Sequence, residues 1–219
     1  MLSMGLQSYY SDLAGIVEGL RTGSDVTVFE KGSERILRIS WLNILNNPRY
    51  FQTLAQVIAS EIRSRGYRPE AVASIETSGA KYGVALSMAT GLPYFSIHKN
   101  RKLVFQDTVE EAGTSVTESR DVRLYLDRQV ASRFKSVVLV DDIRRSSKTL
   151  EAAARLLAAC GVNIEACFVI LDLAFAGHSP PSTIPRDRYH PLLVISSVDR
   201  MGRCTISEGI VLKHLEGHV

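Results

Sequence analysis

Short apolar runs alternate with helical segments between residues 71 and 171, and this alternation constrains the fold more than any other feature. The run Val137–Val140 is continuous and β-branched, as expected of a strand that is covered on both faces. Strands and helices that alternate through short links form parallel sheets with right-handed crossovers. The sequence therefore predicts an α/β fold, a parallel sheet flanked by helices. The predicted strands are residues 71–75, 93–97, 122–126, 137–140 and 166–171, and helices are predicted between Gly79 and Gly91 and over Lys148–Cys160.

The segments on either side of this alternation predict a small cap. Helices are expected over residues 4–22 and 49–65, with a hairpin over Val26–Ile39 between them. Residues 174–190 are rich in Pro and Ser and predict an irregular connection. Strands are expected over Leu192–Val198 and Cys204–Leu212, pairing with the N-terminal hairpin. We thus expect a single domain over residues 1–219, with a core at about 50–175 and a cap from residues 1–48 and 190–219.

Composition excludes several classes of function. Of the 219 residues, 45% are apolar, so the chain can bury a full hydrophobic core without disulfides or metal ions to hold it together. A net charge of +3 is too small to predict bulk nucleic-acid binding. No apolar stretch approaches the roughly 18 residues of a membrane span, and no secretory signal is visible. The three cysteines lack metal or disulfide spacing, so we expect reduced core residues in a cytoplasmic protein.

The most informative segment follows the strand at Val137–Val140. The strand delivers two adjacent carboxylates, Asp141 and Asp142, to the edge of the predicted sheet. Backbone N–H groups and the dipole at the start of the next helix favour an anion, and hydroxyls and a charge reinforce them. These side chains are Ser146, Ser147, Lys148 and Thr149. The pattern predicts a ligand with vicinal hydroxyls beside a phosphate, together with a magnesium ion. The alternative is a capped helix that needs no ligand, with Ser146 or Ser147 as the N-cap and the acidic pair in a solvated turn.

The same segment resembles the signature for 5-phosphoribosyl pyrophosphate (PRPP) of the type I phosphoribosyltransferases: an apolar run, Asp-Asp, an aliphatic residue, a small polar loop and Thr-Leu. In that family the acidic pair holds the ribose hydroxyls and the loop wraps the 5′-phosphate. The resemblance implies the ribose and catalytic role for Asp141 and Asp142, which would contact PRPP-bound Mg²⁺ indirectly. It implies the phosphate role for Arg145, Ser146, Ser147, Lys148 and Thr149.

Two further segments resemble this family in order and spacing, so that the likeness covers about residues 70–172. Glu76–Gly83 resembles the pyrophosphate loop, whose backbone often has an unusual peptide geometry, and this implies contacts from Thr77, Ser78 and Gly79. Gly91–Lys102 resembles the next strand with its basic end, and Lys99, Arg101 and Lys102 are the implied pyrophosphate contacts. The alternative for these three is a solvated basic turn. Residues 103–121 lack periodicity and lie where the family carries a flexible lid.

The phosphate loop departs from the family pattern at two positions. Ser147 stands where Gly is usual, and we expect its Cβ to narrow the phosphate cradle. Arg145 stands where enzymes for 6-oxopurines carry an Asp. We expect Arg144 and Arg145 either to add to phosphate binding, to pair with the acidic residues, or to mark a regulator that senses PRPP without turning it over.

The resemblance implies transfer of the 5-phosphoribosyl group from PRPP to a nucleobase, giving a nucleoside monophosphate and pyrophosphate. The Gly-Leu-Pro and Arg-Leu-Tyr-Leu strands are similar to the adenine and archaeal hypoxanthine/adenine branch, which favours a purine, adenine or hypoxanthine. The alternatives are an orotate phosphoribosyltransferase, a non-catalytic PRPP-binding regulator, and a generic phosphate-binding α/β protein. A homodimer is expected from the resemblance alone, and the five histidines are expected to be structural or exposed.

Overall fold

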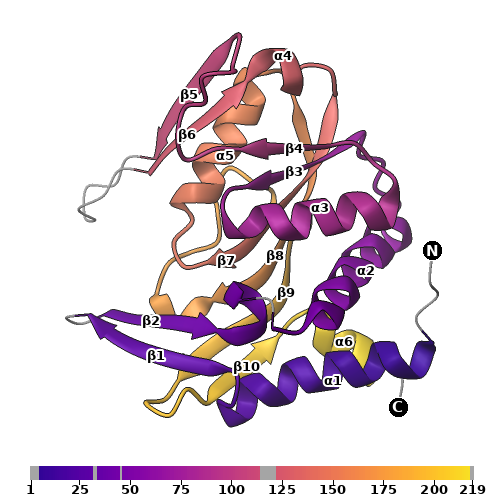
Figure 1. The fold of residues 1–219 in the computed structure, drawn as a ribbon, viewed down its shortest axis with the longest axis vertical. Coiled ribbons are helices and arrows are strands. Elements are labelled where there is room, and N and C mark those ends of the chain that lie inside the picture. The colour runs from indigo at the N-terminus through magenta and orange to yellow at the C-terminus, as the bar shows by residue number, and fades with distance from the viewer. Residues whose placement is uncertain (1–4, 32–33, 45, 114–121, 218–219) are drawn as a thin grey trace.

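A six-stranded, mostly parallel sheet organises the computed structural model, which describes residues 5–31, 34–44, 46–113 and 122–217. All neighbouring strands in it are parallel except β9 and β10, which are antiparallel. The predicted parallel α/β fold is therefore confirmed (Figure 1). In spatial order the strands are β10 (Cys204–Glu208), β9 (Tyr189–Val198), β8 (Asn163–Leu173), β7 (Ser136–Arg144), β3 (Ala71–Ile75) and β4 (Tyr94–Ile97).

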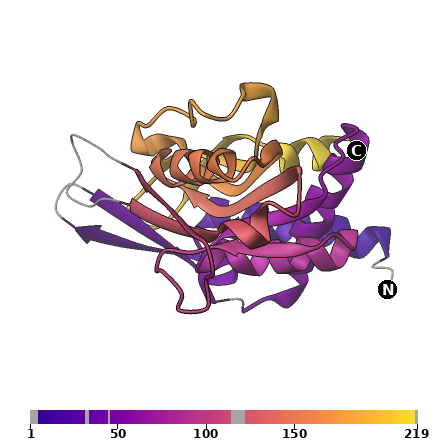
Figure 2. The ribbon, with the colours of Figure 1, turned by 90° about the horizontal axis from the view of Figure 1, so that it is seen from above.

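Both faces of the sheet are buried, which is why its central strands are continuously apolar. Along β7, Val138 and Val140 join one hydrophobic cluster, while Val137 and Leu139 join another on the opposite face. Helices α2 (Pro48–Ser64) and α3 (Ser78–Thr90) cover the first face, and α5 (Lys148–Ala159) covers the second. Figure 2 shows the sheet edge-on between these two layers.

Two hairpins project beyond the sheet. Strands β1 (Val26–Lys31) and β2 (Glu34–Ile39) pair antiparallel, as predicted. The prediction of an irregular stretch over residues 103–121 was wrong in part. Strand β5 (Thr108–Gly113) lies within it and pairs antiparallel with β6 (Val122–Asp127). Strand β5 forms through this pairing and through its packing on α5, where Arg155 and Glu111 form an ion pair at 2.6 Å. Residues 114–121, the rest of the predicted lid, lie outside the described residues.

The C-terminal tail corrects two predictions. Among the described strands, β9 and β10 extend the main sheet and do not pair with the β1–β2 hairpin. The strand predicted to reach Leu212 ends at Glu208, and residues 210–216 form helix α6 (Ile210–Glu216). Gly209 separates the two elements with φ at 143°, a backbone conformation that favours glycine. The apolar side chains beyond it then pack on the core as one helix face.

The remaining elements are helical. Helix α1 (Leu6–Thr22) agrees with the predicted N-terminal helix, and the connection over residues 174–190 is mostly irregular, as predicted. The shorter elements are η1 (Ser40–Ile44), α4 (Arg128–Ala131), η2 (Ala174–Ala176) and η3 (Arg186–Arg188). Within the described ranges, no helix is long and apolar enough to cross a lipid bilayer.

Candidate active site

All the predicted site residues lie at the carboxyl ends of β3, β4 and β7 or in the loops and helix starts that follow these strands. The three strands are parallel neighbours in the sheet, so their carboxyl ends meet at one edge. Ligands of open α/β sheets bind beyond this edge. In Figure 1 the edge lies between the β5–β6 hairpin above and the β1–β2 hairpin below.

The acidic pair lies near the end of β7. Asp141 is 6% exposed, and its Oδ1 accepts a hydrogen bond from the backbone N–H of Asp142 at 3.0 Å. Burial, reinforced by the neighbouring Asp142 carboxylate, raises the pKa of Asp141 well above its ordinary value, and the Lys99 charge opposes this shift. The two carboxyl groups therefore differ in exposure: Asp141 is buried, whereas Asp142 is partly exposed at the edge.

The loop after β3 comes close to this pair. A Cβ at Gly79 would lie only 2.8 Å from Asp141 Oδ1, so glycine permits the start of α3 to approach the carboxylate. Thr77 is the N-cap residue of α3 and makes no side-chain capping bond, and Ser78 is its first helical residue. The peptide between Glu76 and Thr77 is cis, an unusual geometry of the kind that the family resemblance implied. The N–H groups at the start of α3 are thus available to an anion.

The loop after β7 presents a second helix start. Arg145, Ser146 and Ser147 form a bend, and Lys148 and Thr149 begin α5. Ser147 is the N-cap residue but makes no capping bond, so the alternative of a helix capped by Ser147 is not what the structure has. Its φ of −80° lies in the right-handed helical region, where a side chain is unstrained. A serine in place of the usual glycine therefore causes no backbone strain at this position.

Pairing with the acidic residues at the end of β7, one of the alternatives expected for Arg144, is not what the structure has. The Arg144 guanidinium is buried and forms an ion pair with Asp172, the residue opposite it in the register of β7 and β8. The same guanidinium donates hydrogen bonds to the carbonyl oxygens of His178 at 2.8 Å and Ser179 at 3.2 Å. Asp172 also accepts a hydrogen bond from the Tyr189 hydroxyl at 2.7 Å. Arg144 is thus a structural brace directly before the phosphate loop.

The connection after β8 supports the phosphate loop in a way that sequence reasoning missed. The Ser147 hydroxyl donates to the carbonyl oxygen of Ser179. Glu151, in the first turn of α5, accepts hydrogen bonds from the Ser182 N–H at 3.0 Å and hydroxyl at 2.9 Å. One residue in the sequence could have indicated this support. Asp172 is a carboxylate near the end of an apolar strand, and a buried carboxylate needs a partner.

The loop after β4 is held at its two ends, where His98 pairs with Tyr125 and where the Gln106 and Asp107 N–H groups donate to the Asp127 carboxylate. Lys102 Nζ lies 3.5 Å from a carboxylate oxygen of Glu76, and His98 Nδ1 lies 2.7 Å from the same oxygen. His98 therefore contacts the predicted pyrophosphate loop, which its treatment as a structural or exposed residue did not anticipate. Lys99 and Arg101 are exposed. These contacts bring Lys102 to the loop after β3, and Lys99 to within electrostatic range of Asp141.

The donor set fits a magnesium ion in the indirect role that the resemblance implied. Among the described residues, no group of three or more His, Cys, Asp or Glu side chains could hold a metal ion. Asp141 and Asp142 offer carboxylate oxygens, the hard donors that Mg²⁺ prefers. The acidic pair therefore suits an ion that takes its other ligands from substrate and water.

Comparisons with known proteins agree with this geometry. Residues 40–200 match the phosphoribosyl transferase domain family. An adenine phosphoribosyltransferase of an Acidovorax species is 30% identical over 137 residues, which are 62% of this chain and 72% of that protein.

Solved structures give the same fold. The adenine phosphoribosyltransferase of Leishmania tarentolae matches with a TM-score of 0.69 and 15% identity, over 87% of this chain and 90% of that one. The enzyme of Trypanosoma brucei, solved with AMP, pyrophosphate and ribose-5-phosphate, matches with a TM-score of 0.58 and 18% identity, over 71% and 68% of the two chains. The fold is that of the type I phosphoribosyltransferases, and the chain belongs to the phosphoribosyl transferase family.

Proposed function

We propose that this protein transfers the 5-phosphoribosyl group of PRPP to adenine, giving AMP and pyrophosphate. The observation that carries the proposal is the acidic pair at the end of β7, which lies between the starts of α3 and α5. Neither helix start is capped by the side chain of its N-cap residue. Adenine is favoured over hypoxanthine because the similar proteins are adenine phosphoribosyltransferases, and because Arg145 stands where enzymes for 6-oxopurines carry an Asp.

In the proposed reaction, the bond between C1′ of the ribose and pyrophosphate breaks and a bond from a nitrogen of adenine to C1′ forms. Asp141 and Asp142 hold the two ribose hydroxyls through hydrogen bonds. Catalysis then rests on positioning the ribose, since no covalent nucleophile takes part.

The two helix starts divide the anionic groups of PRPP between them. The start of α5, with Arg145, Ser146, Ser147, Lys148 and Thr149, takes the 5′-phosphate. The start of α3, with Thr77, Ser78 and Gly79, takes the pyrophosphate, and Lys99, Arg101 and Lys102 neutralise its charge. Fixed N–H groups and cations stabilise a leaving group as its charge develops. Magnesium, when bound, would supply further charge neutralisation on the phosphate oxygens.

Two further parts of the proposal extend beyond the acidic pair. The protein works in the cytoplasm as a homodimer. The dimer would cover exposed apolar side chains on α3 and in the loop after β4. They are Val84, Met88, Leu103 and Val104.

A turnover assay tests the proposed reaction. We expect product from PRPP, Mg²⁺ and adenine, and much less from hypoxanthine, guanine or orotate. PRPP binding without product from any base would contradict the enzyme and favour the regulator.

A double variant tests the ribose role. Asp141→Asn with Asp142→Asn should lower PRPP affinity at least tenfold, because hydrogen bonds to charged groups contribute about 1.5–3 kcal/mol. The matched control is Glu18→Gln with Glu216→Gln, which removes two exposed carboxylates from α1 and α6. Equal losses in both variants would show that net charge alone explains the result.

A further inference from the structure

A cavity lies away from the carboxyl edge of the sheet, where α1, α2 and α6 meet the end of α3. Its volume is about 470 Å³, within the range of small-molecule sites. The elements that form it lie across the molecule from the edge that carries Asp141 (Figure 1). The proposed reaction does not use this cavity.

One wall of the cavity is a polar face of α2. Gln56, Ser60 and Arg63 lie at positions i, i+4 and i+7 and line the cavity together. In the part of the chain that the structure describes, these three side chains have no hydrogen-bond or ion-pair partner. The wall thus holds an amide, a hydroxyl and a guanidinium whose bonding capacity is unused.

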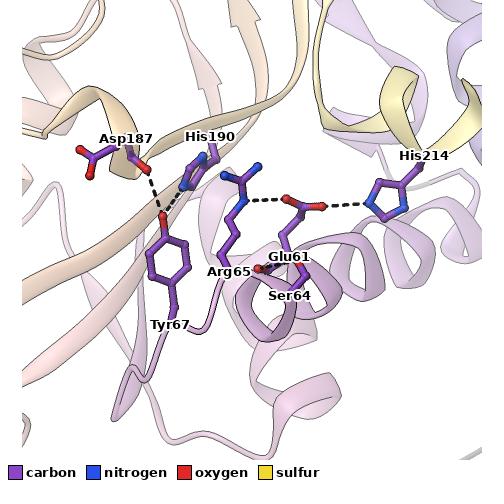
Figure 3. Close-up of polar contacts among 7 residues, drawn as sticks. All are labelled: Glu61, Ser64, Arg65, Tyr67, Asp187, His190 and His214. Atoms are coloured by element: carbon purple, nitrogen blue, oxygen red, sulfur yellow. Dashed lines mark hydrogen bonds and ion pairs between the residues drawn. The ribbon is translucent and has the colours of Figure 1, made fainter. Parts of the chain in front are cut away.

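The opposite wall is fixed by a chain of hydrogen bonds. The Tyr9 hydroxyl lies 2.9 Å from His214 Nδ1, and His214 Nε2 lies 3.1 Å from Glu61 Oε1. Arg65 Nε in turn donates to Glu61 Oε2 at 2.7 Å. Figure 3 shows Glu61 between Arg65 and His214. With a proton on Nε2, His214 donates a hydrogen bond to Glu61, and its Nδ1 can accept one from the Tyr9 hydroxyl. Tyr9 and His214 are therefore held in place before any ligand binds.

The charge of the lining favours an anion. Among the described residues that line the cavity, none is acidic, and Arg63 carries the permanent charge. The Glu61 carboxylate does not line the cavity; it contacts His214 and is already paired with Arg65. A planar guanidinium pairs with phosphate through two parallel hydrogen bonds.

The other lining groups suit a heteroaromatic ring. Tyr9 and Tyr10 supply aromatic surface, which every nucleobase can contact. The Gln56 amide both donates and accepts, as the edge of an adenine ring requires. Gln56 and Arg63 are separated by roughly 10 Å along the helix axis, which matches a ligand with a ring at one end and a phosphate at the other.

We infer that this cavity is a second ligand site, which binds a nucleoside 5′-monophosphate with its phosphate on Arg63 and its base between Gln56 and the tyrosines. The inference does not depend on the proposed reaction. If that reaction is correct, the active site also binds AMP, and the test separates the two sites.

Calorimetric titration of the full chain with AMP is the test. We expect two AMP molecules per chain. Arg63→Met should weaken one of them ten- to a hundredfold and leave the turnover of PRPP and adenine unchanged, and Gln56→Leu should weaken the same one. The double variant Asp141→Asn with Asp142→Asn should affect the other. Arg21→Met in α1 and Gln52→Leu in α2 are matched controls at exposed positions, and the thermal midpoint of each variant reports its folding.

The outcomes distinguish the two proposals. A single AMP per chain, weakened by Arg63→Met and retained by the aspartate variant, supports the second site and contradicts the proposed active site. A single AMP that Arg63→Met and Gln56→Leu leave unchanged overturns the second site. Two AMP molecules that neither cavity variant weakens overturn it as well.

Discussion

The loops after β7 and β4 leave the same edge of one sheet, yet they are held in very different ways. The loop after β7 is fastened at both ends, by the buried pair of Arg144 with Asp172 and by the bonds from Ser147 and to Glu151. The loop after β4 leaves Leu103 fully exposed and Val104 82% exposed, and Lys102 makes only a 3.5 Å contact with Glu76.

The difference assigns different work to the two loops. The loop after β7 is preorganised, so its backbone can receive a phosphate without further ordering. The loop after β4 is held at its base, where His98 pairs with Tyr125 and the Asp127 carboxylate accepts hydrogen bonds from the Gln106 and Asp107 N–H groups. Its tip stays exposed and is open to a ligand or a second subunit. Substitutions in the first loop should therefore change stability, and substitutions in the second should change binding.

The largest effect is expected from breaking the buried ion pair. Arg144→Leu leaves the Asp172 carboxylate buried with the Tyr189 hydroxyl as its remaining partner. Removing one member of a buried pair costs about 3–5 kcal/mol of unfolding free energy, which lowers the thermal midpoint by about 10 °C in a domain of this size. Urea denaturation and calorimetry measure both quantities.

Two further variants sharpen this result. Arg101→Leu, in the loop after β4, removes the same side chain from an exposed position and should change the unfolding free energy by less than about 0.5 kcal/mol. Arg144→Leu with Asp172→Leu should recover much of the loss, because apolar residues replace buried pairs well. A loss in Arg101→Leu as large as in Arg144→Leu would remove the distinction between the loops.

A smaller effect is expected at the acidic pair, where function opposes stability. Because burial raises the pKa of Asp141 from its ordinary 3.8, the native state binds this proton more tightly than the unfolded state. The contribution of Asp141 to stability is therefore complete below pH 3.8 and is lost as pH rises through the raised pKa. Asp141→Asn cannot ionise, so its stability relative to the wild type should increase as pH rises through that raised pKa.

Asp199 provides a control of opposite sign. Hydrogen bonds from the backbone and side chain of Arg203 lower the pKa of Asp199, so this carboxylate stabilises the native state above its ordinary pKa. Asp199→Asn should lose stability relative to the wild type as pH rises. A gain in Asp141→Asn that does not vary with pH would mean that the amide stabilises the protein for another reason.

Sequence reasoning succeeded where structure is local and failed where it depends on register. The strand at Val137–Val140 and the helix after Lys148 follow from composition and periodicity, and both are present. The pairing of Arg144 with Asp172 requires the alignment of β7 with β8, which neither segment specifies alone. Strand β5 contains Glu110 and Glu111 and forms because β6 is available to pair with it.

The same limit applies to the candidate site. The two aspartates and the helix start follow from one continuous segment, so their proximity was predictable. The support from Ser179 comes from a Pro-rich connection whose path no periodicity describes.

A small effect on stability, and the sharpest test of the comparison, is expected at Lys102. Lys102→Gln removes a partly exposed ion pair with Glu76, and such pairs contribute less than about 1 kcal/mol. If the loop after β4 works in binding, pyrophosphate affinity should still fall about three- to tenfold, and less at high salt because exposed charges are screened. Lys135→Gln removes the same charge from an exposed position just before β7, at the opposite edge of the sheet. Equal losses of affinity in Lys102→Gln and Lys135→Gln would trace the effect to net charge, and the loop after β4 would then have no binding role to set against the preorganised loop after β7.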